Sequence, residues 1–225
     1  MTATPLKYSR ADWIMGVAAL LVLAISALIM LWPQGPAPPN IQGAILPTPK
    51  PLSAFRLTDH QGQPFTHTDL NGDWHLISYG FTHCPDICPT TLFELAEFRR
   101  QLEEHGRFTD LQVLFYTIDP IRDTRAKLAD YVPWFHDTFI GLRANNQTQA
   151  DAFQTNLGLT AQVSPSDDPA DYDVAHGMRL YLIDSQGRYR ASLEPTKDRD
   201  GSQYYEPERL LEDYLALRSW SNQLR

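Results

Sequence analysis

Residues 74–89 read WHLISYGFTHCPDICP, and the interpretation of the whole chain starts from this stretch. An apolar run up to Phe81 predicts a buried strand, and Pro89 fits the first turn of a following helix. Between them stand Cys84 and Cys88, the two cysteines of the 225-residue chain. Their spacing would place both sulfurs on one helical face, about 5–6 Å apart at Cβ. Because a helix N-terminus favours the thiolate, the stretch indicates metal or redox chemistry.

A small structural disulfide is the alternative interpretation of this cysteine pair. Such a bridge would close a short loop and would remove little conformational entropy from the unfolded chain. Structural bridges usually join segments that lie far apart in the sequence. We therefore expect Cys84 and Cys88 to take part in metal binding or redox chemistry.

Strands alternate with helices along the rest of the chain. Turn residues at 59–64 predict an opening β-hairpin, and 111–118 predicts a second buried strand. The polar loop 164–173 has a composition that disfavours regular structure. Runs at 178–184 and 188–193 predict a later hairpin. This order predicts an α/β fold, a thioredoxin-like sandwich with an N-terminal hairpin. The expected helices cover residues 89–105, 124–135, 147–156 and 207–220.

The N-terminal region predicts a membrane anchor followed by a tether. Residues 13–32 contain no charged side chain, begin and end with Trp, and are long enough to cross a bilayer as a helix. Proline-rich residues after this segment predict an extended linker. We expect a cytoplasmic segment at 1–12, one transmembrane helix at 13–32, a linker at 33–52 and one domain at 53–225.

The distribution of basic residues predicts the orientation of the anchor. Lys7 and Arg10 precede it, and the first basic residue after it is Lys50, so the N-terminus should stay in the cytoplasm. The short leader, which is not rich in Arg and Ser, favours a bacterial inner membrane with the domain in the periplasm. A cleaved signal peptide is the alternative.

The formal net charge of −8 argues against a polyanionic partner. We therefore expect no nucleic acid to bind. The domain of about 170 residues suits a single hydrophobic core.

Three segments of the expected domain carry distinctive motifs. They are GFTHCPDICPTTL at 80–92, IDPIRDT at 118–124, and His176 shortly before LYLID at 180–184. Together they resemble the Sco (SenC) family, membrane-anchored copper chaperones for cytochrome c oxidase with a thioredoxin-like fold. The resemblance covers the whole domain. It implies that Cys84, Cys88 and His176 are ligands of copper, as Cu(I) or Cu(II).

This implied ligand set suits an exchangeable copper ion, since thiolates select Cu(I) and imidazole accepts either oxidation state. His83 is interpreted as a neighbour that tunes thiol acidity, because adjacent side chains diverge. Ala175 and Gly177 offer no side-chain group that could orient the ring of His176. The segment 119–124 is expected to shape a turn and a helix cap without a chemical role.

The main prediction is a metallochaperone rather than an enzyme. It would receive copper from a periplasmic donor and pass it to the copper-binding subunit of cytochrome c oxidase, for the dinuclear copper centre. The alternative is a thiol–disulfide reductase, with Cys84 and Cys88 as a redox-active disulfide that keeps the oxidase cysteines reduced. His176 discriminates, since a reductase has no evident use for it. A thiol peroxidase is disfavoured, because the resemblance to that family would place a Ser or Thr hydroxyl three residues before Cys88, and this chain has Pro85 there. A sensor of copper or redox state is a further alternative.

Overall fold

The computed structural model describes residues 10–30, 36–164 and 173–224. The chain divides into two compact units, one up to Ala37 and a folded domain over Pro38–Gln223. In the first unit, helix α1 spans Arg10–Met30. Across the described ranges, no helix combines the length and apolar character of a membrane span. Parts of the predicted segments 1–12, 13–32 and 33–52 lie outside the described residues.

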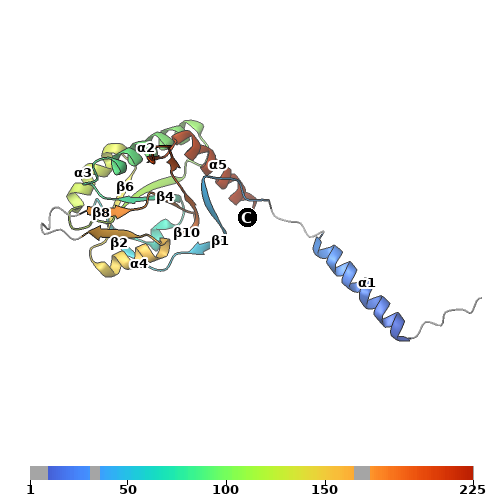
Figure 1. The fold of residues 1–225 in the computed structure, drawn as a ribbon. Coiled ribbons are helices and arrows are strands. Elements are labelled where there is room, and N and C mark those ends of the chain that lie inside the picture. Colours follow the sequence, from blue (N-terminus) through green and yellow to red (C-terminus); the bar gives the residue numbers. More distant parts are fainter. Residues whose placement is uncertain (1–9, 31–35, 165–172, 225) are drawn as a thin grey trace, which may run out of the picture. The chain divides into compact units, whose positions relative to one another are not determined.

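An eight-stranded sheet forms the centre of the domain, in the order β1-β10-β9-β4-β5-β6-β2-β3 (Figure 1). Strands β4, β5 and β6 run parallel, and the other pairings are antiparallel. The sheet contains β1 Gly43–Pro51, β2 Arg56–Asp59, β3 Pro64–Thr66, β4 Trp74–Gly80, β5 Leu111–Thr117, β6 Ile140–Arg143, β9 Leu180–Ile183 and β10 Arg188–Leu193. The two predicted hairpins are confirmed as β2–β3 and β9–β10.

Helices cover both faces of the sheet (Figure 1). Helices α2 Ile87–His105, α3 Arg125–Phe135 and α5 Pro207–Gln223 bury one core with residues such as Trp74 and Leu92. Helix α4 Gln147–Leu157 packs on the opposite face, where Ile77 and Phe153 belong to a second core. A short 3-10 helix, η1 His67–Leu70, precedes β4. This arrangement confirms the predicted α/β class.

Part of the predicted linker belongs to the domain. Strand β1, Gly43–Pro51, pairs antiparallel with β10 from Gly43 opposite Leu193 to Pro51 opposite Arg188. The tether prediction for these residues was wrong because proline, which cannot donate a ladder hydrogen bond, is tolerated on an edge strand. Ile41 and Leu52, which flank β1, are buried.

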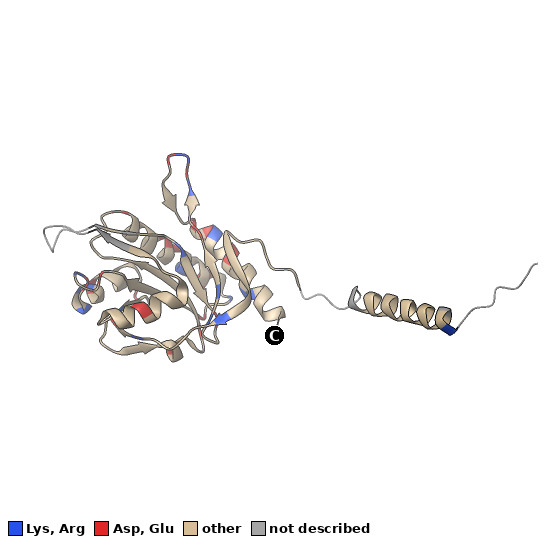
Figure 2. Cartoon of the chain, turned by 60° about the horizontal axis from the view of Figure 1, so that its bottom comes forward, with Lys and Arg blue, Asp and Glu red and all other residues tan. Residues whose placement is uncertain are grey.

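Two small sheets lie apart from the central one. Strands β7 Ala161–Ser164 and β8 Asp173–His176 pair antiparallel, so the ends of the predicted irregular loop 164–173 are strand residues. Residues 165–172 of that loop are outside the described part of the chain. Strands β11 Thr196–Lys197 and β12 Gln203–Tyr204 form a projecting hairpin, and acidic and basic residues are interspersed over the domain (Figure 2).

Candidate metal-binding site

The two cysteines occupy different kinds of backbone. Helix α2 begins at Ile87, two residues before Pro89, so Cys88 lies in its first turn. Cys84 lies in the turn that precedes the helix, which corrects the expectation that both sulfurs share a helical face. The N–H of Cys88 nevertheless donates to Cys84 Sγ at 3.4 Å. Cys84 therefore takes the position of an anion at a helix N-terminus.

The two thiols differ in acidity and access. The pKa of Cys84 is lowered to about 5, chiefly because the Cys88 thiol donates to its sulfur, with further help from backbone N–H groups of residues 86–88. The pKa of Cys88 is raised, because its proton is held by Cys84 and because the side chain is buried. Both cysteines are free thiols, and Cys84 is the half-buried one. The pair thus presents one available thiolate and one protected thiol.

We expect iodoacetamide to modify Cys84 first. Its rate should rise with pH through about 5 and then level off, because the thiolate fraction is complete above the lowered pKa. Cys88→Ala should raise the pH of this transition, since the hydrogen bond from Cys88 is the largest cause of the shift. Peptide mapping by mass spectrometry between pH 4 and pH 8 would measure both rates. A Cys84 rate that still climbs about tenfold between pH 7 and pH 8, as for an ordinary thiol, would contradict the assignment.

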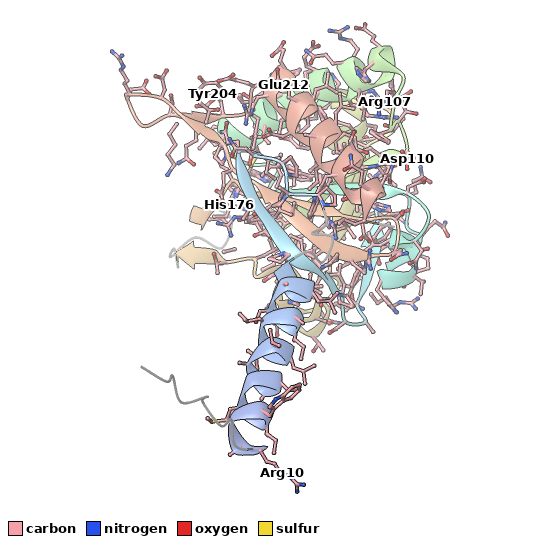
Figure 3. The ribbon with its side chains drawn as sticks, turned by 90° about the vertical axis from the view of Figure 1, so that its right-hand side faces the viewer. Arg10, Arg107, Asp110, His176, Tyr204 and Glu212 are labelled. Atoms are coloured by element: carbon pink, nitrogen blue, oxygen red, sulfur yellow. The ribbon has the colours of Figure 1, made fainter. Side chains whose placement is uncertain are left out.

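Tertiary structure brings His176 to the cysteine pair. His176 is the last residue of β8 (Figure 3), and its Nε2 lies 3.7 Å from Cys88 Sγ. On the other side of the ring, Nδ1 lies 2.6 Å from the carbonyl oxygen of Gly177. The carbonyl can only accept, so Nδ1 carries the proton and Nε2 presents its lone pair toward Cys88. The backbone of Gly177 thereby orients the ring, a role that the sequence assigned to no residue.

The backbone of β4 approaches the buried sulfur closely. A Cβ built on Gly80 would lie 2.6 Å from Cys88 Sγ and 3.3 Å from the ring of Phe115. A cavity of about 10 Å³ lies beside Cys88 and His176, with Tyr79 and Met178 among the residues that line it. A volume of about this size accommodates a single water molecule or ion.

The separation between Cys88 and His176 fits a shared ion. At 3.7 Å, Cys88 Sγ and His176 Nε2 are close enough for one ion to contact both atoms if it were bound between them. Within the described ranges, no set of three His, Cys, Asp or Glu side chains is already close enough to hold an ion as it stands.

A buried carboxylate supports the cysteine loop. Asp123 is fully buried and accepts hydrogen bonds from the Thr82 N–H at 2.9 Å, the Thr82 hydroxyl at 2.5 Å and the Thr117 hydroxyl at 2.6 Å. His83 lies 3.8 Å from the same carboxylate, and Lys127 Nζ lies 3.0 Å from His83 Nε2. The motif 118–124 therefore positions the cysteine loop, in addition to forming the expected turn and the Thr124 cap of α3.

Fold and site together define a class of protein. Three parallel strands, a cysteine pair after the first of them and a histidine from a distant hairpin characterise a thioredoxin-like protein equipped for soft-metal or thiol chemistry. The comparison with known families agrees with this class. The SCO1/SenC family matches residues 46–205, and the chain belongs to that family.

Individual relatives agree with the family assignment. The mouse protein SCO2 homolog, mitochondrial, is 39% identical over 135 residues, which are 60% of this chain and 52% of the mouse protein. The aligned region therefore spans about half of that relative. A protein of Stutzerimonas stutzeri described as copper-binding is 36% identical over 164 residues, covering 73% of this chain and 79% of the relative. The crystal structure of yeast Sco1 with copper bound has a TM-score of 0.66 at 30% identity, covering 76% and 90% of the two chains.

Proposed function

We propose that this protein is a copper chaperone that binds copper through Cys84, Cys88 and His176. Its recipient would be the dinuclear copper centre of cytochrome c oxidase. The observation that carries the proposal is the 3.7 Å approach of His176 Nε2 to Cys88 Sγ, between residues 88 positions apart. Thiol exchange has no need of an imidazole there, whereas two thiolates and an imidazole form a ligand set for copper. The copper-binding relatives support copper as the cargo.

The unequal exposure of the two sulfurs suits transfer by ligand exchange. Cys84 is partly exposed and already favours the thiolate, so a ligand of a donor or recipient protein can reach an ion bound there. Cys88 lies behind it, buried against β4, and can retain the ion until a replacement ligand arrives. We propose that a periplasmic copper donor and the copper-binding subunit of the oxidase approach the site from the Cys84 side.

Anaerobic copper titration of the reduced full-length chain tests the proposal. We expect one copper per chain with thiolate-to-copper absorption, loss of tight Cu(I) binding in Cys84→Ser or Cys88→Ser, and Cu(II) affinity reduced about 10-fold or more in His176→Ala. His105→Ala is the matched control, because it removes an exposed histidine from the last turn of α2, at the opposite end of the helix from Cys88. Unchanged Cu(II) affinity in His176→Ala would refute the three-ligand site.

A thiol–disulfide reductase is the second candidate function, and the lowered pKa of Cys84 favours it. Such an enzyme would reduce the cysteines of the oxidase subunit before they bind copper. The oxidised chain, with a Cys84–Cys88 disulfide, should bind no copper until a reductant is added. A chain that exchanges disulfides rapidly but binds copper weakly, with no effect of His176→Ala, would identify reduction as the principal activity.

We also propose that the segment 13–32 anchors the protein in a bacterial inner membrane, with the domain in the periplasm. The apolar side chains of α1 support contact with lipid, since Trp13, Leu20 and Leu23 are 71%, 68% and 65% exposed. Such surface is stable when lipid covers it. Deleting residues 1–37 should move the protein from the membrane fraction to the soluble fraction of a cell lysate. A deleted chain that stays with the membranes would overturn the assignment of the anchor.

A further inference from the structure

His176 needs support beyond its own strand. It ends β8, which pairs only with β7 among the described strands and does not join the central sheet, whose strand β4 leads into the cysteine loop. The ladder places Ala161 opposite His176 and sets the position of the backbone. It leaves the imidazole free to rotate about its side-chain torsions. The Gly177 carbonyl holds Nδ1 at one side of the ring, and contacts to the faces and edge of the ring must complete its support so that Nε2 stays toward Cys88.

Two aromatic residues at the carboxyl end of β4 supply these contacts. The ring centroid of Tyr79 lies 5.3 Å from that of His176 with a tilt of 53°, and the ring centroid of Phe81 lies 5.9 Å away in an edge arrangement at 79°. Both separations fall within the range of favourable aromatic pairs. A Cβ on Gly177 would lie 3.0 Å from the Tyr79 hydroxyl, so the chain after His176 also rests against Tyr79. We call Tyr79 and Phe81 the aromatic clamp.

Phe81, one of the two residues of the aromatic clamp, is itself in contact with the 118–124 motif. The guanidinium carbon of Arg122 lies 5.7 Å from the centroid of the Phe81 ring, a cation–π arrangement. Arg122 forms a salt bridge with Asp119, whose side chain is buried. Contacts thus run from Asp119 through Arg122 and Phe81 to His176. The planar guanidinium suits this stacking better than an ammonium group would.

We propose that the aromatic clamp positions His176 for metal binding and so determines how strongly the site favours Cu(II) over Cu(I). The inference rests on the proposed function. Two thiolates can satisfy Cu(I) without help, whereas Cu(II) favours added nitrogen ligands such as imidazole. A ring held with Nε2 toward Cys88 needs no ordering when the ion arrives, and this preorganisation strengthens the Cu(II) complex selectively. Phe81 and Tyr79 are positioning residues, and the imidazole is the ligand.

Copper titration of the full-length Phe81→Ala chain tests the inference. We expect Cu(II) affinity to fall about 10- to 100-fold, the loss typical of removing a group that orients a ligand. Cu(I) affinity should change by less than about threefold, because the thiolates remain. Phe81→Tyr keeps the ring and should retain the Cu(II) affinity of the parent chain. Arg122→Lys should lower Cu(II) affinity about two- to fivefold. Phe93→Ala is the matched control, since Phe93 is an exposed ring that makes edge contacts with Trp134 and Phe135.

A measurement on the metal-free protein gives an independent readout. In the parent chain, the imidazole carbon and nitrogen NMR signals of His176 should report one ring orientation with the proton on Nδ1. In Phe81→Ala the ring should rotate away from the Gly177 carbonyl, so these signals should move toward values averaged over both tautomers, while circular dichroism shows an unchanged fold. Signals that do not move would overturn the inference.

The outcomes separate the inference from the function on which it rests. If the parent chain fails to bind copper, the proposed function fails. If the parent binds copper and His176→Ala weakens Cu(II), but Phe81→Ala matches the parent, only the aromatic clamp is refuted. Equal losses of Cu(I) and Cu(II) affinity in Phe81→Ala would also refute it, because they would indicate damage to the cysteine pair.

Discussion

Replacing Asp123 by Ala should lower the free energy of unfolding by about 3 kcal/mol and weaken copper binding at the same time. The substitution leaves the Thr82 N–H and the Thr117 hydroxyl without their buried acceptor. Thr82 lies two residues before Cys84, so loss of its anchor should also loosen the thiolate at the start of α2. Urea denaturation and copper titration of the same variant measure the two effects.

Asp184→Ala is the matched control for this variant. Asp184 is also a buried carboxylate in a turn, and it accepts from the N–H groups of Gln186 and Arg188. It follows β9 near the opposite end of β4, since Ile183 pairs with His75. We expect comparable destabilisation without loss of copper affinity. Asp123→Asn keeps a side-chain oxygen and should be milder, so it provides a folded variant if Asp123→Ala unfolds. Copper affinity that falls equally in Asp184→Ala would contradict a local role for Asp123.

The second large effect is expected for Gly80→Ala, which should reduce copper affinity about 100-fold. The added Cβ would stand 2.6 Å from Cys88 Sγ, so the sulfur must leave its position or the strand must shift. Overpacking of this kind also costs about 1–3 kcal/mol of stability. Copper titration beside a thermal melt would separate the two consequences.

Gly141→Ala is the control that separates crowding of the Cys88 sulfur from general destabilisation by an added methyl group. A Cβ on Gly141 would lie 3.0 Å from a methyl group of Val132. Gly141 belongs to β6, which is separated from β4 by β5. Both variants should therefore be destabilised by crowding, but only Gly80→Ala crowds a proposed copper ligand. Normal copper affinity in Gly80→Ala would show that the position of Cys88 seen in the structure is not the one that binds the ion.

The sequence by itself determined the local structure of this protein. Hydrophobic runs identified β4 and β5, and the helix ends predicted at residues 105, 135 and 156 lie within one residue of those in the structure. These signals are readable because a buried strand, a cap or a tight turn depends on residues a few positions apart. Family resemblance added the three expected ligands, which spacing alone could not have connected.

The tertiary structure alone decided which distant groups meet. Pairing with β10 made an edge strand of residues assigned to the linker, and the β7–β8 hairpin carried His176 to 3.7 Å from Cys88. Burial beside Thr82 gave Asp123 its supporting role. Sequence could not predict these contacts, because chain folding sets the distance between residues far apart in sequence. The cysteines mark where the chemistry can occur, and the fold decides which side chains surround them.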